Sequence, residues 1–332
     1  MPRRPAMPCR RSALRLALAA LLAAPARPGV AQEYPAQPLR LVIPFAPGGT
    51  NDIVGRLVTE GMGVRLGQPF VVENRGGAGG LMGAEVVSRA APDGYTLLLG
   101  GSGSLTINSL MNSRSPFDAA TAFAPIGLIG AGDNVIVVWP GLPARSLREL
   151  QALARRSAVP LSYGSPGVGS TGHVAGAMVA EALGVPMTHV PYRGTGPAMN
   201  DLLAGRIQVF TNALAPLQPA IEAGTLRALA IAGPRRNPAL PTLPTTAEAG
   251  FPQIEAATWF GLFAPAGTAP DRVARLHAAL NATLAEPATA RRLREGGLDV
   301  TPSASPADFA EFYAADRARW AGVVARASLR SP

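Results

Sequence analysis

The chain has 332 residues, of which 48% are hydrophobic and 15% charged, a balance typical of a globular protein with a sizeable core and, by length, roughly two domains. An aromatic content of 5% argues against a base-stacking nucleic-acid surface, and with Cys9 as the only cysteine, neither thiolate metal sites nor disulfides can hold the fold. Of the net charge of +9, the arginines before Gln32 supply +6 with no acidic residue beside them, so no strongly basic surface is expected for nucleic acid.

Residues 1–31 have the layout of a secretory signal. A basic start precedes an apolar stretch at 13–24, which is too short to span a bilayer, and small residues precede Gln32. We expect cleavage after Ala31 and export to the periplasm. Cys9 precedes the apolar stretch, which disfavours a lipid-modified mature cysteine, while Arg10-Arg11 leaves both the general and the twin-arginine export routes open.

From residue 39 onward, short apolar strands alternate with helical stretches, which predicts an α/β architecture with a largely parallel sheet. The first unit is expected to contain strands at 39–44, 70–73, 96–100, 126–129 and 135–139 and helices at 51–65 and 81–90. The sequence Gly130-Ala131-Gly132-Asp133 predicts a turn between the last two of these strands.

A second α/β unit begins after Ser146, a candidate helix cap. Its expected strands are 161–164, 188–191, 207–211 and 226–232, and its expected helices are 146–156, 171–183, 196–204 and 217–223. A loop at 235–252 leads to a strand at 258–264 and helices at 270–286, 288–296 and 306–327. This order predicts two lobes, 32–133 with 256–332 and 134–255, joined by a hinge of two crossings near Asp133 and Ala256.

Three glycine-rich turns each lie between a strand and a helix. They span residues 44–52, 100–104 and 163–171. In parallel α/β sheets such turns lie at the carboxyl ends of strands, where the following helix presents unpaired N–H groups and a positive dipole end. With their nearby hydroxyl groups, three equivalent turns predict an anion pocket, whereas a single turn would be read as a helix cap alone.

Other chemistries find little support. Gly167-x-Gly169-x-x-Gly172 matches the dinucleotide fingerprint, but no acidic residue ends the next strand near Tyr192, as an NAD site would need. Arg193 there could face a 2′-phosphate, so an exported NADP-dependent Rossmann oxidoreductase remains the alternative. The chain contains no lysine for a Walker loop and no Gly-x-Ser-x-Gly elbow, and the histidines after residue 31 lack metal-ligand spacing. Asp52 is expected to stabilise the first turn of its helix.

Several motifs in order resemble the substrate-binding receptors of tripartite tricarboxylate transporters, also called Bug proteins. The motifs are residues 44–52, 73–80, 163–173, 189–194, 226–230 and 259–265, so the resemblance covers essentially the whole exported chain. It implies a periplasmic two-lobed flytrap of the type II binding-protein class that captures a small carboxylate and passes it to membrane permease subunits. Neither an enzyme nor a cofactor or metal is expected, and we expect a monomer. A sensory receptor feeding a signalling partner would share the same cleft.

The resemblance also implies ligand-binding positions. In this sequence they are Phe45, Ala46, Gly48, Gly49, Thr50, Asp52, Ser102, Ser104, Ser165, Gly169, Ser170, Thr171, Tyr192 and Asn212. Many members of the family carry an aspartate before the asparagine that is Asn212 here, where this chain has Thr211. That departure points to an acid without an amine.

Overall fold

The computed structural model describes residues 34–326. The signal sequence expected at 1–31 lies outside the described residues. Residues 34–36 lie outside the compact unit that begins at Gln37, and the fold below is that of this unit. In the part of the chain that is described, no helix has both the length and the apolar character needed to cross a membrane.

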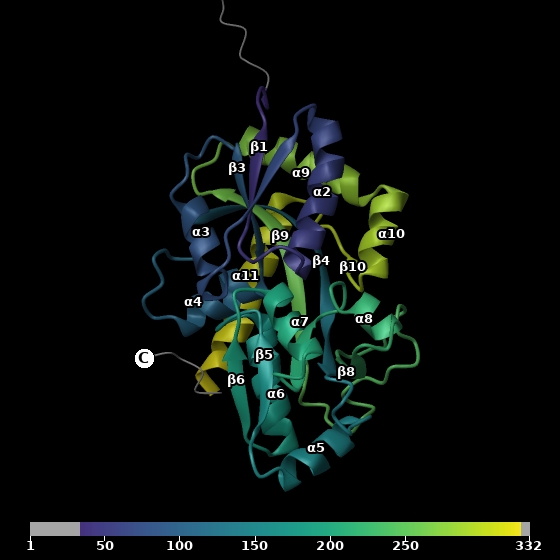
Figure 1. The fold of residues 1–332 in the computed structure, drawn as a ribbon. Coiled ribbons are helices and arrows are strands. Elements are labelled where there is room, and N and C mark those ends of the chain that lie inside the picture. The colour runs from purple at the N-terminus through teal and green to yellow at the C-terminus, as the bar shows by residue number, and fades with distance from the viewer. Residues whose placement is uncertain (1–33, 327–332) are drawn as a thin grey trace, which may run out of the picture. The chain divides into compact units, whose positions relative to one another are not determined.

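The structure confirms the predicted alternation of strands and helices, and most element ends agree with the sequence prediction within two residues. Figure 1 shows their arrangement. The strands are β1 Leu39–Ile43, β2 Phe70–Asn74, β3 Thr96–Gly101, β4 Phe123–Val138, β5 Leu161–Ser165, β6 Met187–Pro191, β7 Val209–Ala213, β8 Arg227–Ala232, β9 Ala257–Pro265 and β10 Asp299–Val300. The helices are α2 Thr50–Leu66, α3 Leu81–Ser88, α4 Asn108–Met111, α5 Leu147–Arg156, α6 Thr171–Leu183, α7 Thr195–Leu203, α8 Gln218–Glu222, α9 Pro270–Leu284, α10 Pro287–Glu295 and α11 Pro306–Arg326, with a 3-10 turn η1 Ala78–Gly80 and a π-helical segment η2 Ser102–Ile107.

The strands form one sheet in the order β2-β1-β3-β9-β4-β7-β5-β6, with β8 and β10 paired to β4. The outer ladders, β1 with β2 and β3 and β5 with β6 and β7, are parallel as predicted. The central ladders are antiparallel, so the prediction of a largely parallel sheet is wrong there. The reason is that β9 returns from the second group of strands beside β4 and opposite to it in direction.

The predicted turn at residues 130–133 is also wrong, because these residues continue a single long strand, β4. Gly130 pairs with Phe260 across a register shift, and the ladder runs on to Asp133. The backbone of Gly297, just before β10, comes so close that a Cβ at Gly132 would lie 2.7 Å from its carbonyl oxygen. The glycines in this stretch therefore allow a close backbone approach and a bulge, and they do not reverse the chain.

The long strand β4 changes partners in its middle. Up to Asp133 it pairs with β9 and β10, and from Asn134 it pairs with β7 and β8. Figure 1 shows β4 and β9 running between the purple and the teal groups of elements. Strand β9 begins at Ala257, which pairs with Asp133 at the end of the β4–β9 ladder.

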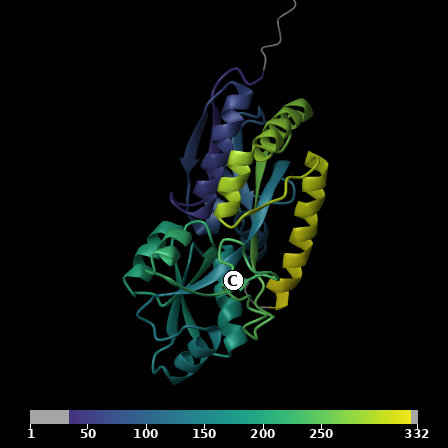
Figure 2. The same cartoon turned by 90° about the vertical axis from the view of Figure 1, so that its right-hand side faces the viewer.

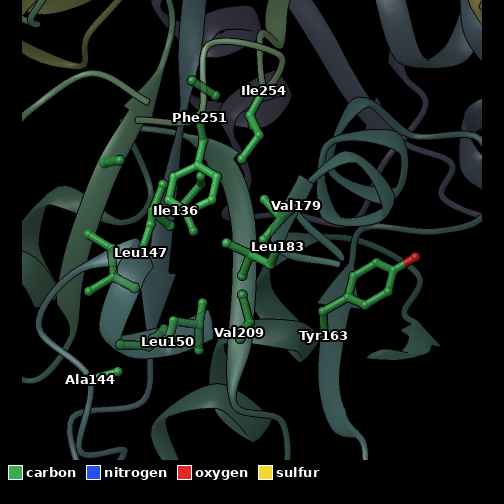
Figure 3. Packing of buried hydrophobic residues seen from close by; sticks show 14 of the residues in the cluster. Ile136, Ala144, Leu147, Leu150, Tyr163, Val179, Leu183, Val209, Phe251 and Ile254 are labelled. Atoms are coloured by element: carbon green, nitrogen blue, oxygen red, sulfur yellow. The ribbon is translucent and has the colours of Figure 1, made fainter. Parts of the chain in front are cut away.

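Separate hydrophobic clusters lie on the two sides of this partner change. One packs α5 and α6 against the strands around Ile136, and Figure 3 shows Phe251 and Ile254 of the long loop closing over it. Ser146 caps α5 as predicted, its side chain accepting a hydrogen bond from the N–H of Glu149. On the other side, α11 packs against the sheet through a cluster rich in aromatic side chains. Helix α2 packs against α9 and α10 on the same side of the partner change (Figure 2).

Candidate functional site

The glycine-rich turns meet at one cavity with about 30 Å³ of enclosed space, and with about 470 Å³ of empty space when its open mouth is counted. Its walls come from the turns after β1, β3 and β5, from the start of α7, and from β7 and β9. The lining residues are Phe45, Gly49, Thr50, Asn51, Gly101, Gly103, Ser104, Pro166, Ser170, Thr171, Gly172, Thr195, Asn212, Ala213, Thr258 and Phe260. The cavity therefore collects the beginnings of several helices.

None of these lining side chains is ionisable, so the polarity of the cavity comes from helix starts and neutral groups. The backbone N–H groups of Thr50 and Asn51 open α2, and those of Thr171 and Gly172 open α6. Across residues 34–326, no partner for these four N–H groups is found. Free N–H groups and the positive dipole ends of two helices favour an anion.

Two buried hydroxyl groups in the cavity lack partners. The Oγ1 of Thr50 and the Oγ of Ser104 make no hydrogen bond to any described residue, although Thr50 is only 5% and Ser104 only 1% exposed. Leaving a buried polar group unpaired costs roughly 1–3 kcal/mol. These hydroxyls are therefore suited to meet a polar ligand or its water.

On the opposite wall, Asn212 at the end of β7 donates a hydrogen bond through its Nδ2 to the Oγ1 of Thr195, 3.1 Å away. Among the residues that the structure describes, the hydroxyl hydrogen of Thr195 and the Oδ1 of Asn212 have no further partner, so both are available to a ligand. Thr258 of β9 donates to the Oδ1 of Asn134, 3.1 Å away, and so is held by the strand where β4 changes partners.

The structure brings together only part of the predicted site. The predicted residues that line the cavity are Phe45, Gly49, Thr50, Ser104, Ser170, Thr171 and Asn212. The predicted residues that do not line it are Ala46, Gly48, Asp52, Ser102, Ser165, Gly169 and Tyr192. Most residues of the second group support the first through hydrogen bonds.

Asp52 anchors the first turn. Its carboxylate accepts hydrogen bonds from the N–H of Gly48 at 3.0 Å, from Nε of Arg56 at 2.9 Å and from Nδ2 of Asn74 at 3.0 Å. Burial by itself would raise the pKa of Asp52, but the bonds from Arg56, Gly48 and Asn74 outweigh it and lower that pKa. This confirms the expected helix-terminus role.

The turn after β5 rests on two stacked histidine rings. The hydroxyl of Ser165 is within hydrogen-bond distance of both the carbonyl and the N–H of Gly167. The Oγ of Ser165 also lies 2.7 Å from Nε2 of His189. The N–H of Gly169 donates to Nδ1 of His173, whose ring stacks on His189 with centroids 4.1 Å apart. Burial lowers the pKa of both rings, that of His189 to about 4 with a contribution from His173, so both are neutral at pH 7.

Ser170 lines the cavity, but its hydroxyl is already engaged. It donates to the carbonyl of Gly167 at 2.7 Å and accepts from the N–H of His173 at 3.2 Å, which makes it the cap of α6. The direct donors on this side are therefore the N–H groups of Thr171 and Gly172 and the hydroxyl of Thr171.

Ser102 and Tyr192 act at a distance from the cavity. The Oγ of Ser102 accepts the N–H of Trp259 at 3.1 Å and so ties η2 to β9. The hydroxyl of Tyr192 donates to Asp201 at 2.7 Å, and burial together with this carboxylate raises the pKa of Tyr192 to about 12. Both side chains stabilise the walls.

Sequence reasoning missed several lining residues. Gly194-Thr195-Gly196 is a fourth glycine-rich turn between a strand, β6, and a helix, α7, so the same signal could have found Thr195. Thr258 and Phe260 lie within the antiparallel strand β9, where no turn marks them. No group of three or more metal-ligating side chains is found within residues 34–326.

Comparisons with known proteins show the family of this chain. The sequence profile of the tripartite tricarboxylate transporter family receptor matches residues 54–329. Protein BugT of Bordetella pertussis is 34% identical over 301 residues, which cover 90% of this chain and 92% of BugT.

Solved structures show the same fold. The periplasmic binding protein BugD has a TM-score of 0.87 and 34% identity, covering 90% of this chain and 100% of BugD. The structure of R. palustris Rpa4515 with adipate has a TM-score of 0.86 and 36% identity, covering 89% of this chain and 99% of the other. These likenesses confirm the predicted α/β periplasmic binding-protein fold.

Proposed function

The chain belongs to the family of tripartite tricarboxylate transporter receptors, and we propose that it captures a small organic carboxylate in the cavity and delivers it to membrane permease subunits. The observation that carries this proposal is the cavity itself, where free N–H groups of two helix starts and two unpartnered hydroxyls face a space without ionisable side chains. Adipate, bound in a relative that is 36% identical, indicates the class of ligand.

We propose two lobes, 32–133 with 256–332 and 134–255. Support comes from β4, which changes partners between Asp133 and Asn134, and from the separate hydrophobic clusters on either side. Two chain crossings at adjacent points allow a hinge. A ligand that contacts both lobes binds the closed form more tightly than the open form and so stabilises it. The permease would then recognise the closed form.

The ligand-binding set proposed here is the group of predicted residues that line the cavity, with Thr195, Gly172 and Asn51 added. Ser165, Gly169, Asp52, Gly48 and Tyr192 would act indirectly by holding the turns.

Export through the signal sequence, a periplasmic location and a monomeric state complete the proposal. Family membership supports the location, and a binding role supports the absence of catalysis. The comparisons lend no support to the NADP-dependent oxidoreductase. A sensory partner in place of a permease would leave the cavity unchanged, so co-purification with the permease subunits distinguishes the two.

Calorimetry with adipate and related dicarboxylates tests the function, combined with mass spectrometry of small molecules released from the denatured protein. We expect one acid to bind at one site per chain and to reduce the radius of gyration in small-angle scattering. Failure of every carboxylate to bind, or a cofactor released in place of an acid, would contradict the proposal.

A further inference from the structure

Backbone turns from the two proposed lobes contact each other beside the cavity. The turn containing Gly79 faces the turn after β5, and the Val168 carbonyl oxygen occupies the place that a Cβ at Gly79 would take. From the other side, a Cβ at Gly167 would lie 3.2 Å from both the N and the Cα of Gly79. The contact at Gly79 leaves no room for a Cβ, and Gly167 combines a tight contact with a φ of +141°, which favours glycine there.

Asn108, at the start of α4, is wedged between these turns. It is only 4% exposed, and its Nδ2 donates a hydrogen bond to the carbonyl of Ala78. On its other side, its Oδ1 and Cβ lie 2.6 and 2.7 Å from where a Cβ at Gly169 would be. Asn108 therefore fixes one turn and gives the other a surface to rest on.

A second contact of the same kind joins the turn after β6 to the turns after β1 and β2. The N–H of Ala46 donates to the carbonyl of Arg193 at 3.4 Å. A Cβ at Gly76 would lie 2.9 Å from that carbonyl oxygen, and one at Gly194 would lie 2.7 Å from the Cβ of Ala46. Both contacts join elements on opposite sides of the partner change in β4.

None of the residues that make these two contacts lines the cavity. A ligand in the cavity would therefore not touch them, and their contribution to closure is separate from its own.

We propose that residues 76–80 together with Asn108 form a closure seat, on which the turns 167–169 and 193–194 of the other lobe dock without help from a ligand. The proposal rests on the two-lobed receptor proposed above. By supporting the closed form, the seat sets the fraction of the protein that is competent to hold a ligand. The apparent dissociation constant equals the intrinsic dissociation constant divided by that fraction.

A disulfide trap measures closure without any ligand. An ideal Cβ at Gly49 lies 3.3 Å from the Cβ of Thr195, close to the 3.5–4.5 Å that a disulfide needs. Gly49→Cys with Thr195→Cys, in a chain carrying Cys9→Ser, provides the only two thiols. A mild oxidant such as diamide then converts the two thiols to a disulfide at a rate that follows the closed fraction.

Into this trap we introduce Gly79→Ala, and separately Gly76→Ala, which has no positive φ and so no backbone strain of its own. The matched control is Gly67→Ala, because Gly67 has φ +68° against +61° at Gly79 and has nothing within 4 Å of its Cβ position. Thermal unfolding of each variant establishes that it is folded.

We expect both seat variants to slow trapping by about ten-fold or more, the equivalent of about 1.4 kcal/mol, and the control to leave the rate unchanged. Equal rates in all variants would overturn the closure seat while leaving the receptor proposal intact. Absence of trapping in the parent pair would also overturn it, because the lobes would then not close without ligand. Carboxylate binding by calorimetry tests the receptor function independently of both outcomes.

Discussion

The Oγ of Ser165 lies 2.7 Å from Nε2 of His189, and this contact links the glycine-rich turn of α6 to a pair of stacked, neutral imidazole rings. His173, the second ring, accepts the N–H of Gly169 through its Nδ1, so it cannot carry a proton on that nitrogen while the bond exists. The turn that faces the cavity is therefore supported by groups that are uncharged at neutral pH.

This support predicts a loss of stability in acid. The pKa of His189 is about 4 in the folded protein and 6.5 in the unfolded chain, so the unfolded state binds more protons between these values. Stability is then full above pH 6.5 and falls as pH drops toward 4, by on the order of 1 kcal/mol for this partly exposed ring. Urea unfolding across this range measures it. His189→Gln should flatten the profile, and an unchanged slope in that variant would place the acid sensitivity elsewhere.

The unpartnered hydroxyls predict where ligand hydrogen bonds are lost. Thr50→Val and Ser104→Ala should each weaken carboxylate binding by about ten- to a hundred-fold, because a hydrogen bond to a charged group contributes about 1.5–3 kcal/mol. Thr106→Val is the control, since its Oγ1 is equally buried and unpartnered but does not line the cavity. Calorimetry that finds equal affinities in all three variants would remove these hydroxyls from the site.

Ser170 and Ser146 are matched helix caps, each accepting a backbone N–H at 3.2 Å. Ser170→Ala and Ser146→Ala should both destabilise the protein by about 0.5–2 kcal/mol in chemical denaturation. Only Ser170→Ala should also weaken ligand binding, because its hydroxyl holds the carbonyl of Gly167. Wild-type affinity in Ser170→Ala, together with a loss in Thr171→Val, would show that the cap is not needed for binding.

The uncharged lining predicts discrimination against amines. An ammonium group buried without a carboxylate partner carries a large desolvation cost. None of the side chains that line the cavity is a carboxylate. If adipate is a ligand, 2-aminoadipate should bind at least about ten-fold more weakly in calorimetry. Equal affinity for the two acids would mean that an acidic group outside the lining reaches the amine.

Asp133 lies where β4 changes partners, and its effect on the stability of the fold should change with pH in the opposite direction to that of His189. Burial raises its pKa to about 6, with the charges of Asp299 and Glu255 adding to the effect and Arg235 opposing it. The folded state then binds more protons between pH 3.8 and 6, so this carboxyl makes the protein less stable as pH rises through that window.

Asp133→Asn mimics the protonated form. The free energy of unfolding of the variant should match that of wild type near pH 4 and exceed it above pH 6 by on the order of 1 kcal/mol. The difference is this small because solvent screens the charge of the partly exposed carboxyl. Urea unfolding at the two pH values measures the difference. A variant that is less stable at both would show that the charged carboxylate makes a favourable contact.

The sequence by itself determined the order of elements and the position of the functional turns. Apolar periodicity and helix-start residues located α6 at 171–183 without error, because these signals are local. The resemblance of several motifs in order also identified the family, which the match over residues 54–329 confirms. Thr50, Ser104 and Thr171 were found in this way as cavity residues.

Tertiary structure alone decided what is not local. Gly130 and Gly132 suggested a turn, yet they continue β4 because other backbone segments approach them there, and the sequence does not encode those neighbours in the same stretch. The same holds at the site, where Ser170 and Thr171 are adjacent and equally polar. Only the fold shows that the Gly167 carbonyl takes up the hydroxyl hydrogen of Ser170, because a hydrogen bond depends on where the chain places both partners.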